Sequence, residues 1–245
     1  MVKPAKASAS DVAPPARAYH HGNLRQALLE AALVLAQQRG PEGVSVREAA
    51  RQLGVSPGAP FRHFPNRRAL MTAMAEEASA RLQIEVRKAI RPRDKTPLAR
   101  LRALGRGYLR WARAHEAHFR IVSARDQIDL AGSPGLQASM QAVRALTEQT
   151  LHEAQAVGEV SAAHDAAALA LLSRATVYGL ARMQLDGHLP QWGVKPGGEA
   201  AATEATLALL INLLAGGEES KKLSTAPARP SGSSKRVQSR HKAQL

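Results

Sequence analysis

The chain has 245 residues, enough for one large domain or for a small domain beside a larger one, and it can bury a core without covalent cross-links. It has no cysteine, which excludes disulfides and thiolate chemistry, and no apolar run approaches the roughly 18 residues of a membrane span. Its formal net charge of +14 favours a polyanionic partner. Residues 1–17 are basic but lack the apolar stretch of a signal peptide, so we expect a cytoplasmic protein with no membrane partner.

The positive charge is concentrated at the two ends of the chain. Residues 1–91 hold 14 Lys and Arg against 7 Asp and Glu, residues 92–215 hold 13 against 11, and residues 216–245 hold 7 against 2. This split indicates that the ends meet a polyanion while the middle serves another purpose. Basic tails that only keep the protein soluble give the same pattern.

Composition divides the chain into four segments. Residues 1–18 and 217–245 are polar and basic without apolar periodicity, which predicts a disordered arm and a disordered tail. Between them, Pro92 and Pro97 mark a boundary. We expect a smaller helical domain over 19–91 and a larger helical domain over 92–216.

The first predicted helix has apolar residues at helical spacing. Leu24, Leu28 and Leu35 share one face, Asn23 is placed to cap the start, and Gly40 ends the helix.

A second helix is predicted from Ser45, whose spacing to Glu48 fits a capping box in which two backbone N–H groups are satisfied reciprocally. Gly54 breaks this helix. A short third helix is predicted after Pro57, although Pro60 removes one of its backbone donors. Two short helices around a glycine turn have the anatomy of a helix-turn-helix.

The rest of the chain also has helical periodicity. A fourth helix follows Asn66, and further helices are predicted over 97–114, 116–125, 135–157, 163–187 and 199–215. No stretch alternates with period two, and alanine and leucine dominate. The pattern predicts an all-α fold, with a three-helix helix-turn-helix domain over 19–91 that is expected to bind DNA and a larger helical domain over 92–216.

Polar and small residues of the helix-turn-helix are the candidates for DNA contact. An exposed second helix enters a major groove roughly 12 Å wide, where side chains bond phosphates and base edges and small residues allow close approach. The side chains of Ser56, Arg62 and His63 are suited to such bonds. Phe64 is expected in the core, whereas Phe61 either packs inward or lies against the DNA backbone. The candidates from the residues themselves are Arg47, Ser56, Gly58, Ala59, Phe61, Arg62, His63 and Arg67.

The run from Tyr19 to Ala78 resembles the N-terminal domain of the TetR family without a gap. Its most specific part is VSVREAARQLGVSPGAPFRHFPNRRAL, and the opening YHHGNLR is common in one branch. The resemblance implies that Val55 to Leu70 carry the recognition helix and the start of the next helix, and it adds Ser45 to the DNA-facing set. The family usually has a phosphate-binding tyrosine where this chain has Phe61, and a lysine where it has Arg67.

The stretch from Arg174 to Ala181 resembles the Trp-x-x-x-His-Gly-Leu-Ala pattern of that branch, with Arg174 and Tyr178 replacing the tryptophan and the histidine. The resemblance implies a ligand-binding and dimerisation domain. Large apolar side chains here either form the core or line an effector cavity. A buried Arg174 needs a structural carboxylate or an anionic effector as its partner. The candidate ligand-binding residues are Trp111, Phe119, Met140, Arg174 and Tyr178.

No motif of an enzyme, a metal site or a cofactor is found. His115 and His118 are spaced to share a metal, but no further ligands join them. One face of the 97–114 helix, which is either solvated or in contact with DNA, carries Arg102, Arg106, Arg110 and Arg113. A sequence-blind nucleoid-type DNA-binding protein and a helical interaction module without DNA function are the alternatives to a regulator.

The expected function is therefore a sequence-specific regulator of transcription that is not an enzyme. Two subunits pair through their last long helices, and the homodimer binds double-stranded DNA at a near-palindromic operator. The resemblance implies a repressor that an unidentified small-molecule effector releases from its operator.

Overall fold

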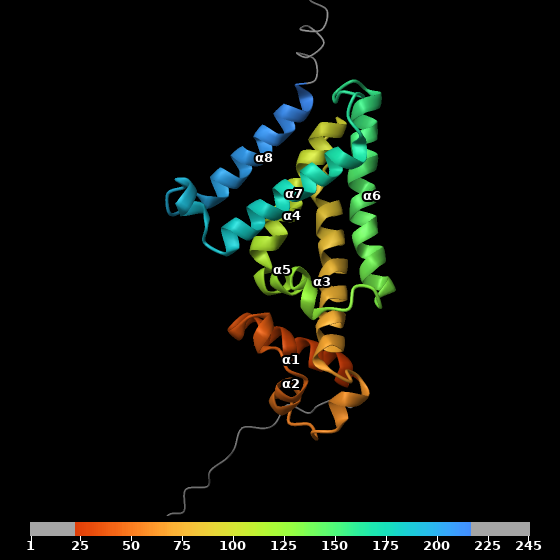
Figure 1. Cartoon of the computed structure of the whole chain (residues 1–245), viewed down its shortest axis with the longest axis vertical. Coiled ribbons are helices and arrows are strands. Elements are labelled where there is room, and N and C mark those ends of the chain that lie inside the picture. The colour runs from red at the N-terminus through yellow and green to blue at the C-terminus, as the bar shows by residue number, and fades with distance from the viewer. Residues whose placement is uncertain (1–22, 217–245) are drawn as a thin grey trace, which may run out of the picture. The chain divides into compact units, whose positions relative to one another are not determined.

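The computed structural model describes residues 23–216. The arm expected at 1–18 and the tail expected at 217–245 lie outside the described residues. Within residues 23–216 every regular element is helical and there is no strand, which confirms the all-α fold (Figure 1). The helices are α1 (Leu24–Arg39), α2 (Val46–Gln52), α3 (Arg67–Ala89), α4 (Pro97–Ala114), α5 (Glu116–Ser123), α6 (Pro134–Ala156), α7 (Ala166–Leu185) and α8 (Glu199–Ala215).

Four short 3₁₀ turns connect these helices: η1 (Pro41–Gly43), η2 (Ala59–Arg62), η3 (Arg125–Gln127) and η4 (Leu189–Trp192). The predicted helix ends agree with the structure to within three residues. The third predicted helix is different, because the segment after Pro57 forms only the 3₁₀ turn η2. Pro57 and Pro60 have no backbone N–H to donate, and the Ala59 N–H donates to the Ser56 carbonyl (3.1 Å), which is the i→i−3 bond of a tighter turn.

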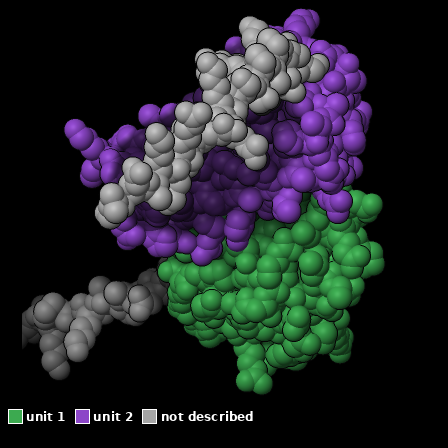
Figure 2. All heavy atoms as spheres, turned by 45° about the horizontal axis from the view of Figure 1, so that its top comes forward, with its two compact units in different colours: residues 1–84, 111–142 green, residues 85–110, 143–245 purple. Residues whose placement is uncertain are grey.

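The described residues form two compact units (Figure 2). Unit 1 contains residues 23–84 and 111–142, and unit 2 contains 85–110 and 143–216. The long helices α3, α4 and α6 contribute residues to both units. None of the described helices combines the length and the apolar character that crossing a membrane requires.

Unit 1 has one continuous hydrophobic core, in which α1 packs against α2 and α5. Leu28, Leu35, Phe64, Met71 and Ile121 are almost completely buried in it. The apolar face of α1 that the sequence predicted therefore lies inside this core, and it supports the helix-turn-helix from beneath.

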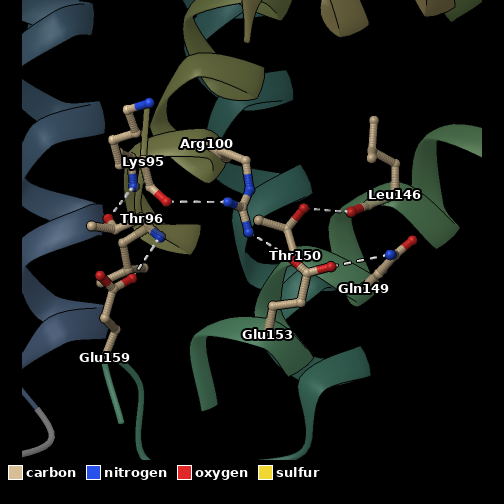
Figure 3. Close-up of polar contacts among 10 residues, drawn as sticks. Lys95, Thr96, Arg100, Leu146, Gln149, Thr150, Glu153 and Glu159 are labelled. Atoms are coloured by element: carbon tan, nitrogen blue, oxygen red, sulfur yellow. Dashed lines mark hydrogen bonds and ion pairs between the residues drawn. The ribbon is translucent and has the colours of Figure 1, made fainter. Parts of the chain in front are cut away.

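Ion pairs join the helices of unit 2. Arg100 of α4 pairs with Glu153 of α6 and donates to the Lys95 carbonyl (3.3 Å), while Glu159 accepts from the Leu98 backbone N–H (2.8 Å) (Figure 3). These bonds tie the start of α4 to the end of α6 and the turn after it.

A close contact between α4 and α8 is also built into unit 2. A Cβ atom at Gly105 of α4 would come within 2.8 Å of a Leu207 methyl group of α8, so only glycine fits there without a shift of that side chain. Beside this contact, Arg102 and Arg106 of α4 both bind Glu204 of α8.

Candidate DNA-binding surface and ligand cavity

The start of α2 is fixed by a side-chain cap. The Ser45 hydroxyl accepts from the Glu48 backbone N–H (3.4 Å), as the sequence predicted. The other half of the predicted capping box does not form, because the Glu48 carboxylate accepts two hydrogen bonds from Arg51 (2.6 and 3.0 Å). These bonds, and the nearby charges of Arg51 and Arg39, hold the pKa of Glu48 below its ordinary value.

The turn after α2 depends on a left-handed glycine. Gly54 has a φ of 65°, a conformation that side chains with a Cβ disfavour. The Val55 N–H then donates to the Ala50 carbonyl (3.2 Å). Pro60 and Phe64 are buried, so η2 is held against the core of unit 1, while Arg62 and His63 between them are exposed. Arg25 of α1 lies 5.5 Å from the centre of the Phe64 ring.

The exposed face of the helix-turn-helix carries side chains that have no protein partner. Arg47, Ser56, Arg62 and His63 are exposed, and among the described residues their side chains make no ion pair or hydrogen bond. Gly58 is exposed beside them, and the space around its α-carbon is open. The face therefore presents two guanidinium groups, a hydroxyl and an imidazole to solvent, which is the donor set that phosphates and base edges accept.

The remaining candidates for DNA contact are less exposed. Ser45, Ala59 and Phe61 are half-buried, and Phe61 packs against the unit 1 core. The ring of Phe61 therefore helps to support η2, and it has no hydroxyl with which to bind a phosphate.

Arg67 lies at the start of α3, and its guanidinium is held within unit 1. It donates to the carbonyls of Val44 (2.9 Å) and Pro41 (2.7 Å) and to the side-chain oxygen of Gln127 (2.7 Å). Gln127 in turn donates to Glu42 (2.6 Å). Arg67 thus links the turn before α2 to η3, a role that residue type and family position did not reveal.

Unit 2 contains a largely apolar cavity between α4, α6, α7 and α8, with a contribution from Val86 of α3. Its empty volume is about 500 Å³, which includes the space at its open mouth. Its lining comprises Val86, Leu101, Leu104, Gly105, Tyr108, Val143, Thr147, Ser173, Arg174, Val177, Leu207, Leu210 and Ile211.

Of the five predicted ligand-binding residues, Arg174 is part of this lining. Its guanidinium carbon lies 4.5 Å from the centre of the Tyr108 ring and 5.3 Å from that of the half-buried Tyr178. Trp111 and Phe119 are buried in unit 1.

Met140 also belongs to unit 1, where its sulfur accepts from Arg125 (3.2 Å). Tyr108 was not among the sequence candidates. Its contact with Arg174 joins α4 to α7, and no local sequence pattern indicates such a contact. In the described part of the chain no three histidine or carboxylate side chains gather as metal ligands.

Comparisons with known proteins agree with this architecture. Residues 28–74 match the family described as bacterial regulatory proteins, tetR family, and residues 101–220 match the tetracyclin repressor-like C-terminal domain. The class C tetracycline repressor protein of Escherichia coli is 44% identical over 52 residues, which is 21% of this chain and only 24% of that protein.

Solved structures extend the likeness to most of the chain. A protein of unknown function from Rhodococcus sp. RHA1 has a TM-score of 0.69 at 31% identity, covering 81% of this chain and 99% of the other. A regulatory protein of the tetR family from Rhodococcus RHA1 has a TM-score of 0.61 at 17% identity, covering 77% of this chain and 95% of the other, a likeness of fold.

A capped helix-turn-helix on a larger helical domain defines a transcriptional regulator that binds DNA. The chain belongs to the TetR family, since both of its domains match that family and its fold is shared with solved members.

Proposed function

We propose that this protein is a homodimeric repressor that binds a near-palindromic operator and is released from it by a small molecule. The observation that carries the proposal is the set of exposed side chains without protein partners, Arg47, Arg62 and His63, on a helix-turn-helix whose other arginines are engaged. Exposed cations without acid partners are free to bind phosphates and base edges, and they incur no cost of breaking an internal ion pair.

Exposed leucines on the last two helices support pairing of two subunits. Leu171 and Leu172 of α7 are 69% and 49% exposed, and Leu209 and Leu213 of α8 are 57% and 70% exposed. A four-helix bundle formed by α7, α8 and their symmetry mates buries all four. The two recognition segments of the dimer then meet major grooves roughly 34–36 Å apart, or a multiple of that distance.

The cavity of unit 2 is the proposed effector site. An effector shifts the protein to a state with lower DNA affinity only if it binds that state more tightly. Helix α6 contributes Val143 and Thr147 to the cavity lining, and it is the next helix after η3, whose Gln127 binds Arg67. We propose that movement of α6 changes the contact between Gln127 and Arg67 beside the helix-turn-helix. The cavity then acts by binding a ligand and not by catalysis.

The test is selection of bound DNA from a random pool at roughly physiological salt, followed by sequencing. The proposal predicts enrichment of an inverted repeat. Strong binding without an enriched motif supports the sequence-blind nucleoid-type protein instead, and no binding contradicts a DNA-binding regulator. With the selected operator in hand, placing it across a promoter and measuring transcript levels distinguishes repression from activation.

A further inference from the structure

We propose that the cavity of unit 2 binds a slim amphipathic anion, an apolar body with one carboxylate head group, and that Arg174 holds the head group. The inference rests on the proposed function in taking this cavity as the effector site. It adds the charge and the shape of the ligand.

The lining of the cavity sets the sign of the ligand charge. Among the described residues that line it, Arg174 is the only charged one, and none is an aspartate or a glutamate. A cationic ligand therefore has no counter-charge there and is repelled by the guanidinium. A neutral ligand leaves the guanidinium without a charged partner in an apolar surrounding, which is unfavourable.

Arg174 is positioned to bind an anion. It is half-buried, and among the described residues it makes no hydrogen bond and no ion pair. Its partners are the rings of Tyr108 and Tyr178, at 4.5 and 5.3 Å. Contact with a ring satisfies none of the hydrogen-bond donors of the guanidinium, so its N–H groups remain for a carboxylate that accepts two of them side by side.

The two aliphatic hydroxyl groups of the lining do not compete for this role. Ser173 donates to the Leu169 carbonyl (2.8 Å), and Thr147 donates to the Val143 carbonyl (2.9 Å). Each hydroxyl has a single proton, so neither has a donor left for a ligand. Arg174 is therefore the cationic donor that the lining offers to a carboxylate.

The rest of the lining determines the shape and polarity of the ligand's apolar body. They are aliphatic, with Leu101, Leu104, Val177, Leu207, Leu210 and Ile211 as the main contributors. The close approach of α4 and α8 at Gly105 keeps the cavity narrow. A linear alkyl chain or a single ring with a short acid side chain fits such a space better than a fused ring system.

The proposal is tested by the affinity of the full-length protein for two pairs of probes, measured by ligand-observed saturation-transfer NMR. The pairs are octanoate with octanamide and 3-phenylpropanoate with 3-phenylpropanamide, in which each amide keeps the shape and removes the charge. For the native protein we expect each acid to bind at least tenfold more tightly than its amide. In Arg174→Gln this preference should disappear while amide binding is unchanged.

Arg182→Gln is the matched control, because it removes one positive charge from the same helix at a residue that pairs with Asp186 (2.8 Å) and does not line the cavity. It should keep the preference for acids. Arg174→Lys, which keeps the charge but loses the planar fork, should show a reduced preference, and it decides the matter if thermal melting shows that Arg174→Gln does not fold. Equal binding of acid and amide by the native protein, no binding of either acid, or a full preference in Arg174→Gln overturns the proposal.

The same probes are added to the complex with the selected operator. Acid binding that depends on Arg174 but leaves the complex intact supports the anion site and contradicts the effector role of the cavity. If the protein binds its operator but binds neither acid, the proposed anion site is wrong, while the proposed binding to a near-palindromic operator is supported.

Discussion

Arg62 and Arg67 are only five positions apart, yet their side chains have opposite environments. Arg62 is exposed without a partner among the described residues, whereas Arg67 donates to two carbonyls and to Gln127. Residue type does not distinguish them, but the environment of each guanidinium does. The structure therefore predicts that Arg62 serves binding and that Arg67 serves the stability of the domain.

For Arg62→Ala we expect weaker operator binding with little change in the free energy of unfolding. If Arg62 reads a base, preference at one operator position should relax by about 1–3 kcal/mol, and an equal loss on all sequences assigns Arg62 to a phosphate. Fluorescence anisotropy with single-base operator variants measures both outcomes. Arg144→Ala is the control, because it removes the same charge from an exposed pair with Glu148 in unit 2. Unchanged affinity in Arg62→Ala contradicts the proposed surface.

For Arg67→Ala we expect a loss of about 1–2 kcal/mol in the free energy of unfolding, because two backbone carbonyls lose a charged donor. Urea denaturation followed by circular dichroism gives this value. Arg68→Ala is the comparison, since Arg68 donates only to the Ile128 carbonyl (3.0 Å), and its loss should be smaller. The prediction is wrong if both variants are equally stable.

At the scale of the helix or turn, the sequence predicts what depends on near neighbours. The caps at Asn23 and Ser45 and the break of the helix at Gly54 follow from residue chemistry within four positions, and the structure confirms them. The prolines at 57 and 60 give the limit of this reasoning. They indicate a helix that lacks backbone donors, but the sequence does not show that the segment forms a 3₁₀ turn instead.

Contacts between distant segments are not predictable in this way. The arginine face of α4 suggests either solvent or DNA, whereas Arg102 and Arg106 bind Glu204, 102 and 98 residues away. These bonds lower the pKa of Glu204, with the hydrogen bond from Arg106 as the main cause. The cavity shows the same limit: large side chains were the sequence candidates, but leucines, valines and Ile211 form most of the wall.

The apolar faces of α7 and α8 lead to a prediction about assembly. For the double variant Leu171→Glu, Leu213→Glu we expect a monomer, because four carboxylates per dimer would be buried in the proposed bundle. Light scattering after size exclusion measures the mass of the particle. Ile84→Glu places the same charge on another half-exposed apolar residue, in unit 1, and should leave the dimer intact. A double variant that still has twice the chain mass excludes this interface.

For the whole molecule, the uneven charge predicts how DNA binding depends on salt. Residues 217–245 hold 7 Lys and Arg against 2 Asp and Glu, so they add a positive segment whose attraction to DNA is independent of sequence. Each phosphate that a protein neutralises adds about −0.9 to the slope of log affinity against log salt. Removing residues 217–245 should therefore flatten the slope and weaken binding to random DNA.

Base contacts made by the helix-turn-helix remain, so the ratio of operator affinity to random-DNA affinity should be kept or should rise. Titrations of both DNAs at several salt concentrations measure slope and ratio together. An unchanged slope leaves the tail with no part in DNA binding, whereas a flatter slope with a reduced ratio means that the tail contributes to sequence recognition itself.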